Sequence, residues 1–153
     1  MLLSELCRRR SRRMNSILFV SMHDGSRGPL AASIFNKMAN PALASARSAG
    51  VYPAAAMDEL VVEVMDGAQL PLVARRPQRL TPELLRTSTL VIHISAGRAR
   101  PPIVTGELRW DVPLIRAATV EAVAAVASDL EGRIGRLIAE RGWRQSLPCV
   151  ARA

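Results

Sequence analysis

The sequence has few residues of the kinds that build metal centres, disulfides or base-stacking surfaces. Its 153 residues include two cysteines, Cys7 and Cys149, one near each end, and two histidines, His23 and His93. Neither cysteine has a C-x-x-C partner and the histidines lack a ligand-like spacing, so we expect no metal and no cofactor. Aromatic residues make up 3% of the chain, which is poor for stacking nucleic-acid bases.

Long apolar runs are also missing. No run approaches the roughly 20 residues that span a bilayer, and the chain does not begin with the apolar segment of a secretory signal. We therefore expect a cytoplasmic protein without membrane contact. A hydrophobic content of 49% and a charged content of 22% are typical of one globular domain with a real core.

Positive charge is concentrated at the start of the chain. Residues 1–13 hold five arginines and one glutamate, which is +4 of the formal net charge of +8, and the other 140 residues carry the remaining +4. A basic tail can bind nucleic acid or anionic lipid, so we expect nucleic acid as a partner only through these arginines. We predict a basic extension over 1–13, which need not be translated because Met14 precedes the first strand, a domain over 14–142 and a tail over 143–153.

Apolar runs and helical stripes alternate between residues 14 and 142. The predicted strands are Ser16–Val20, Leu43–Ser48, Thr89–Ile94 and 107–112. The predicted helices are one capped by Gly28 with Pro29 at its first position, one over Met57–Met65, a short one capped by Thr81, and one over Thr119–Arg141 that stops at Gly142. Strands that alternate with helices predict an α/β fold with a parallel sheet.

The stretch SILFVSMHDGSRGPLAASIF, residues 16–35, joins the first strand to the first helix through a tight loop. Backbone N–H groups that converge at a helix N-terminus bind oxyanions. Arg27 can add a forked contact to two anion oxygens, and Gly25 and Gly28 let the backbone turn closely around a ligand. The candidate anion-binding residues are therefore Ser21, Met22, His23, Asp24, Gly25, Ser26, Arg27 and Gly28, although many such loops are mere connections.

This pattern resembles the low-molecular-weight protein tyrosine phosphatases and the thiol-dependent arsenate reductases of the same fold, with the arsenate reductase branch nearest. The family signature of a cysteine, five residues, an arginine and a serine corresponds to Ser21, residues 22–26, Arg27 and Gly28. The stretches RSAG, LTPELL, TLVIHI and RWDVP follow in the expected order, so the resemblance covers about residues 15–141. It implies a three-layer sandwich with a four-stranded parallel sheet, and an inorganic oxyanion or a phosphorylated group as ligand.

Several family positions carry other residues here. Ser21 replaces the nucleophilic cysteine, Asp24 the loop asparagine, and Gly28 the serine after the arginine. The further cysteines of the arsenate reductases are absent after the third strand. The family's general acid, an aspartate before a proline, aligns with Leu114, and Asp111 is the nearest carboxylate. A cysteine in this loop would be ionised near neutral pH, whereas a serine hydroxyl needs an adjacent base.

We interpret these changes as catalytic degeneration, which leaves a pseudo-enzyme that still binds an oxyanion. A laboratory trapping mutant would change the cysteine alone. Two alternatives stay open. A divergent phosphatase could use Ser21 as nucleophile and Arg27 as anion ligand, with His23 as base or Asp111 as acid. A regulatory interaction module could instead contact nucleic acid through residues 1–13. The sequence does not identify a protein partner.

Overall fold

The computed structural model describes residues 14–74, 76–97 and 108–145. Within them four strands and four helices follow one another along the chain: β1 (Asn15–Ser21), α2 (Arg27–Met38), β2 (Ala44–Gly50), α3 (Glu59–Gly67), α4 (Pro82–Thr87), β3 (Leu90–Ser95), β4 (Leu108–Asp111) and α5 (Val120–Arg141). The sheet order is β2-β1-β3-β4, and all three pairings are parallel. This confirms the predicted α/β fold with a four-stranded parallel sheet.

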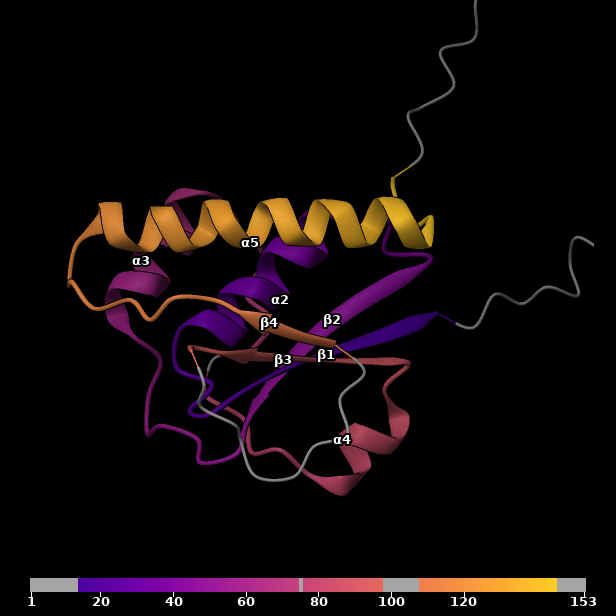
Figure 1. The fold of residues 1–153 in the computed structure, drawn as a ribbon, viewed down its shortest axis with the longest axis horizontal. Helices are drawn as coiled ribbons and strands as arrows, with labels where there is room; N and C mark the ends of the chain where they lie inside the picture. The colour runs from indigo at the N-terminus through magenta and orange to yellow at the C-terminus, as the bar shows by residue number, and fades with distance from the viewer. Residues whose placement is uncertain (1–13, 75, 98–107, 146–153) are drawn as a thin grey trace, which may run out of the picture.

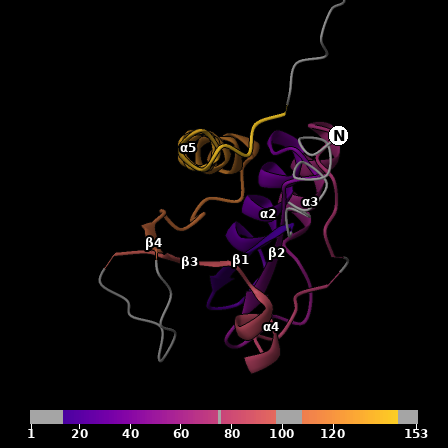
Figure 2. The same ribbon diagram turned by 90° about the vertical axis from the view of Figure 1, so that its right-hand side faces the viewer.

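The sheet is the middle layer of three. Helices α2, α3 and α5 lie over one face, and the short helix α4 lies under the other (Figure 1). The side view separates these layers and shows the four strands edge-on (Figure 2). Because β1 lies between β2 and β3, the loop that follows it opens at the centre of the sheet's carboxyl edge.

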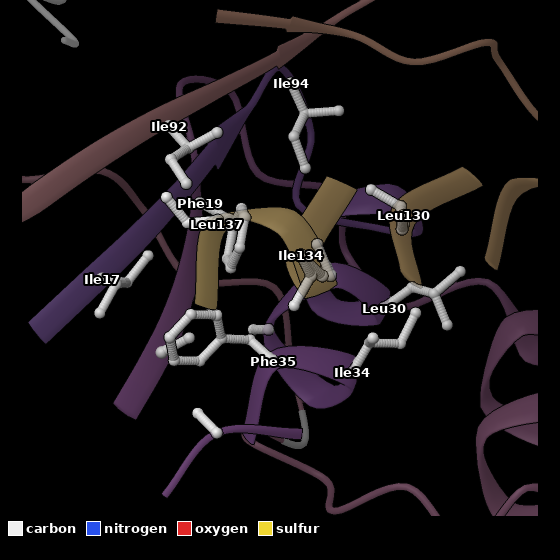
Figure 3. Packing of buried hydrophobic residues seen from close by; sticks show 14 of the residues in the cluster. Ile17, Phe19, Leu30, Ile34, Phe35, Ile92, Ile94, Leu130, Ile134 and Leu137 are labelled. Atoms are coloured by element: carbon white, nitrogen blue, oxygen red, sulfur yellow. The ribbon is translucent and has the colours of Figure 1, made fainter. Parts of the chain in front are cut away.

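The middle of β1, Ile17–Val20, is entirely apolar and fully buried on both faces, as is usual for an inner parallel strand. Ile17 and Phe19 pack into the large cluster under α2 and α5, whereas Leu18 and Val20 pack into a smaller cluster over α4. Figure 3 shows the large cluster, which includes Leu137 of α5 and in which the Phe19 ring meets the Phe35 ring of α2 edge to face. Packing on both faces therefore fixes the strand that carries the loop.

Three predicted boundaries need correction. Helix α2 begins at Arg27 with Ser26 as its N-cap residue, so Gly28 does not cap it and Pro29 stands third in the helix. A proline fits there because N–H groups of the first turn have no intrahelical partner. Strand β2 runs on to Gly50, which pairs with Ser21. Helix α3 starts later than predicted, at Glu59, because the Asp58 side chain caps it by accepting from Leu60 N and Val61 N.

The packed structure continues past Gly142, the residue predicted to end the domain. Gly142 does stop α5, in the left-handed conformation with φ 71°. Trp143 is nevertheless buried and meets Phe35 edge to face, and Arg144 bridges to Ala39. Residues 1–13 and 146–153, which include Cys7 and Cys149, lie outside the described residues. In the described part of the chain, no helix is both long enough and apolar enough to span a membrane.

Candidate functional site

The loop from Ser21 to Ser26 connects the carboxyl end of β1 to the first residue of α2. The predicted candidates from Ser21 to Gly28 are therefore contiguous in space as well as in sequence. In open α/β sheets the crevice at the carboxyl ends of the strands is the usual ligand position.

The loop is held in place by its carbonyl groups. Four of them accept hydrogen bonds from the N–H groups of the segment 51–58: Ser21 O from Val51 at 3.1 Å, Met22 O from Tyr52 at 2.8 Å, His23 O from Ala54 at 2.9 Å and Gly25 O from Asp58 at 2.8 Å. In a trans peptide the N–H points opposite to the carbonyl. The N–H groups of residues 22, 23, 24 and 26 are therefore directed away from that segment, toward the inside of the loop.

A hydrogen bond confirms this direction at one position. The Asp24 N–H donates to the Ser21 hydroxyl oxygen at 3.1 Å, across the inside of the loop. The N–H groups of Arg27 and Gly28 follow in the first turn of α2, where helix geometry supplies no partner. Donors that converge in this way, at the positive end of a helix dipole, suit an anion.

Gly50 lets the loop approach β2 closely. A Cβ at this position would lie 2.9 Å from both Asp24 N and His23 C, closer than side chains pack. The Gly50 backbone also pairs with the segment 78–80, because its N–H donates to Gln78 O at 2.7 Å and its carbonyl accepts from Leu80 N at 2.8 Å. Gly50 thus joins the loop to a segment nearly 30 residues further along the chain.

Arg27 brings the positive charge of its side chain to the site. It is 8% exposed, and its Nη1 donates to Val112 O at 2.7 Å, just beyond β4. Burial lowers the pKa of Arg27, and the charge of Asp111 raises it. The bond to Val112 fixes the guanidinium at the edge of a pocket and leaves other N–H groups for a ligand.

This pocket has a volume of about 220 Å³ and brings together three parts of the chain. Its lining residues are Met22, His23, Arg27, Ile94, Ser95, Ala96 and Leu114. Most of this lining is carbon, so a charged group at Arg27 has apolar walls beside it. Leu114, which aligns with the expected acid, lies in this wall.

Asp24 is turned inward rather than toward solvent. It is 1% exposed and has φ 51°, a left-handed conformation that aspartate and asparagine adopt more readily than most residues. Its Oδ2 accepts from Gln78 N at 2.7 Å, whereas its Oδ1 has no hydrogen-bond partner of good geometry among the described residues. Burial raises the pKa of Asp24, and the Gln78 N–H and the Ser48 hydroxyl lower it again.

Gly28 lies against both Ser21 and Asp24. A Cβ at residue 28 would lie 3.1 Å from Ser21 Oγ and 3.1 Å from Asp24 Oδ1. Gly28 is therefore close to both Ser21 and Asp24. A side chain at position 28 would have to fit between the two oxygens.

The other two candidate catalytic residues, His23 and Asp111, each hydrogen-bond to a backbone group. His23 is exposed and lines the pocket, and its ring Nδ1–H donates to Tyr52 O at 2.9 Å. Asp111 is exposed at the end of β4, where its Oδ1 accepts from Gly97 N at 2.8 Å. Asp111 is not among the residues that line the pocket.

Sequence reasoning did not identify Gly50 and Gln78 as residues of the site. Gly50 carried a signal, because a glycine directly after a strand often marks a close backbone approach. Gln78 carried none, since its contribution is a backbone N–H that only the fold brings to Asp24. In the described ranges, no three His, Cys, Asp or Glu side chains come together as a metal site would require.

Comparisons with known proteins agree with this fold. The family model described as "Low molecular weight phosphotyrosine protein phosphatase" matches residues 16–123. An arsenate reductase from Archaeoglobus fulgidus has 22% identity and a TM-score of 0.69, with 80% of this chain and 98% of that chain covered. A thioredoxin-dependent arsenate reductase from Corynebacterium glutamicum has 22% identity and a TM-score of 0.68, covering 90% and 67%. A cysteine-to-serine mutant of the YwlE arginine phosphatase, with a phosphorylated active-site serine, has 22% identity and a TM-score of 0.66, covering 83% and 95%.

Proposed function

Since the chain belongs to the low molecular weight phosphotyrosine protein phosphatase family, we propose that it is a catalytically degenerate member that binds an oxyanion. Phosphate, arsenate or a phosphorylated ligand is the expected occupant of the loop Ser21–Gly28. The observation that carries the proposal is the orientation of the loop peptides. Their carbonyl groups accept hydrogen bonds from residues 51–58, so the opposite N–H groups point away from that segment, and Met22 and His23 line the same pocket as Arg27.

The proposed loss of turnover rests on three positions. Ser21 takes the place of the nucleophile, and a serine hydroxyl is far less acidic than a cysteine thiol. Leu114, at the position where the resemblance places the family's acid, lines the pocket, whereas Asp111 accepts a hydrogen bond from Gly97 and is not among the lining residues. General acid catalysis typically contributes about 10²–10⁴-fold, so the missing carboxylate alone lowers turnover greatly.

Calorimetric titration with phosphate, arsenate and sulfate tests the binding proposal. The wild-type protein is expected to bind at least one of these anions at millimolar concentration. Arg27→Lys keeps the charge but loses the fork, so we expect a loss of affinity of about tenfold, or ~1.4 kcal/mol. Arg136→Lys on the exposed side of α5 is the matched control. Folded wild-type protein that releases no heat with any of the three anions contradicts the proposal.

The turnover proposal has its own test. With p-nitrophenyl phosphate, we expect no sustained release of nitrophenolate at any pH at which the protein is folded. Sustained release that Ser21→Ala abolishes supports the alternative of a divergent phosphatase and contradicts degeneracy.

A further inference from the structure

We propose that the loop takes up an oxyanion together with one proton from solvent, and that the Asp24 carboxylate is the group that receives this proton. The inference rests on the proposed function, because an anion must first occupy the loop. It adds the charge change that accompanies binding: the protein loses one negative charge when the anion enters, so the affinity for the anion depends on pH.

The Asp24 carboxylate belongs to the loop that would hold the anion. The Asp24 N–H donates to Ser21 Oγ at 3.1 Å. Asp24 Oδ1 and Ser21 Oγ each lie 3.1 Å from the point where a side chain on Gly28 would begin, so the carboxylate oxygen is at most twice this distance from the hydroxyl. Gly28 stands in the first turn of α2, where N–H groups have no helical partner. An anion held by these N–H groups is therefore close to the carboxylate.

No described cation pairs with this carboxylate. The Asp24 side chain is 1% exposed, its Oδ2 accepts from Gln78 N, and its Oδ1 has no partner of good geometry among the described residues. Arg27 donates to Val112 O instead, and neither of the described ion pairs includes Asp24. The elements packed around Asp24 carry five titratable or charged side chains, which are His23, Arg27, Arg47, Asp58 and Arg79. The groups that act on the ionisation of Asp24 are the Gln78 N–H and the Ser48 hydroxyl, and neither is charged.

Repulsion between the anion and the carboxylate supplies the coupling. Like charges in a partly buried site repel each other several times more strongly than in water, and a nearby negative charge raises the pKa of a carboxyl group. Burial already raises the pKa of Asp24 above its ordinary value, and a bound anion raises it further. At a pH between these two pKa values, the free loop has an ionised Asp24 and the occupied loop has a protonated one. Binding then draws one proton from solvent.

Calorimetric titration with sulfate measures this proton. Sulfate stays a dianion near neutral pH, so any proton taken up on binding goes to the protein. Titrations in imidazole and in Tris, two cationic buffers with different heats of ionisation, give the number of protons bound per sulfate. For the wild-type protein we expect uptake of up to about one proton, and an affinity that falls by up to about tenfold for each unit of pH between the free and the occupied pKa of Asp24.

Asp24→Asn distinguishes proton uptake from a merely structural role. The amide keeps the size of the carboxyl group and removes its charge, so we expect no proton uptake and an increase in sulfate affinity of about tenfold or more at about pH 8. His23→Gln removes the titratable ring that lines the pocket and should keep the uptake. Asp66→Asn, exposed near the end of α3, is the matched control and should behave like the wild-type protein. Phosphate is the second probe, because its own protonation cancels in the difference between wild type and Asp24→Asn.

Three results would overturn the proposal while the proposed function stands. Wild-type protein that binds sulfate without taking up a proton rules out the coupling. Proton uptake that survives in Asp24→Asn assigns the proton to another group, and its loss in His23→Gln would identify that group as the imidazole. A sulfate affinity of Asp24→Asn no higher than that of the wild type at about pH 8 shows that the carboxylate does not oppose the anion. Absence of binding with sulfate, phosphate and arsenate alike contradicts the proposed function itself.

Discussion

Asp24 is the residue at which the electrostatics of the loop are decided. Its carboxyl group is 1% exposed, and one of its oxygens has no partner of good geometry among the described residues. A buried charged acceptor without a partner carries a desolvation penalty of about 1–3 kcal/mol or more. The same carboxyl group also accepts a hydrogen bond from Gln78 N at 2.7 Å, which holds the loop in place. A substitution that removes the carboxyl group loses this bond, whereas Asp24→Asn removes only the charge.

We predict that Asp24→Asn stabilises the protein at neutral pH. Because burial raises the folded pKa above the ordinary 3.8, the contribution of Asp24 to stability is full below 3.8 and is lost as the pH rises through the folded pKa. The variant should therefore gain about 1–3 kcal/mol near pH 7 and little in acid. Urea unfolding at several pH values measures this, with Asp66→Asn as control. An equal effect of Asp24→Asn at about pH 4 and about pH 8 would contradict the assignment.

On the proposed loss of turnover, replacing Ser21 by a cysteine nucleophile should not be enough for fast phosphate-ester hydrolysis. Ser21→Cys supplies a thiol whose pKa a loop of N–H groups and a helix dipole is expected to lower, yet Leu114 still gives the leaving group no proton. We predict slow turnover of phenyl phosphate by Ser21→Cys and a gain of about 10²–10⁴-fold when Leu114→Asp is added. Steady-state rates of phenol release measure the difference between the single and the double variant. Fast turnover by Ser21→Cys alone would show that another group acts as acid.

At the scale of elements, the last residue of β2 determines how closely the loop can pack against that strand. Gly50 ends the strand, pairs with Ser21 and bonds to Gln78 and Leu80 on its other side. A side chain there would collide with backbone atoms of the loop at 2.9 Å, and backbone cannot move aside as a flexible side chain can. The shape of the loop is thus set by a strand end as well as by its own residues.

Gly50→Ala is predicted to destabilise the protein by about 1–3 kcal/mol, the usual effect of overpacking, and to weaken phosphate binding. Gly132→Ala is the matched control, because a Cβ there meets nothing within 4 Å in α5. Alanine is a better helix former than glycine, so the control should gain up to about 1 kcal/mol. Thermal unfolding and phosphate titration measure both. Wild-type phosphate affinity in Gly50→Ala would show that the loop adapts.

The sequence predicted elements better than it predicted the directions of side chains. Strands were predicted near all four strands of the described sheet, and apolar runs located β1 and β3, because inner parallel strands are buried on both faces. The start of α2 was misplaced, since Pro29 is tolerated at any position of the first turn. The inward turn of Asp24 could not be read from the loop, because its partner is a backbone N–H 54 residues away.

At the scale of the whole molecule, two buried ionisable groups oppose each other in their effect on stability. His93 lies in β3 between Val20 of β1 and Arg109 of β4. It is 5% exposed, and neither ring nitrogen has a hydrogen-bond partner within the described residues. Burial lowers the pKa of His93, and the positive charge of Arg109 lowers it further. His93 therefore favours the folded state at high pH, whereas Asp24 favours it at low pH.

We predict that the protein loses stability on acidification below about pH 6.5 because His93 must take up a proton. Its contribution is present above the ordinary value of 6.5 and is lost as the pH falls through the lower folded pKa. His93→Leu should flatten this part of the pH profile, and the double variant with Asp24→Asn should vary least with pH. Chemical unfolding between about pH 4 and about pH 8 gives the profiles. If His93→Leu kept the wild-type loss of stability between about pH 7 and about pH 5, another group would have to carry it.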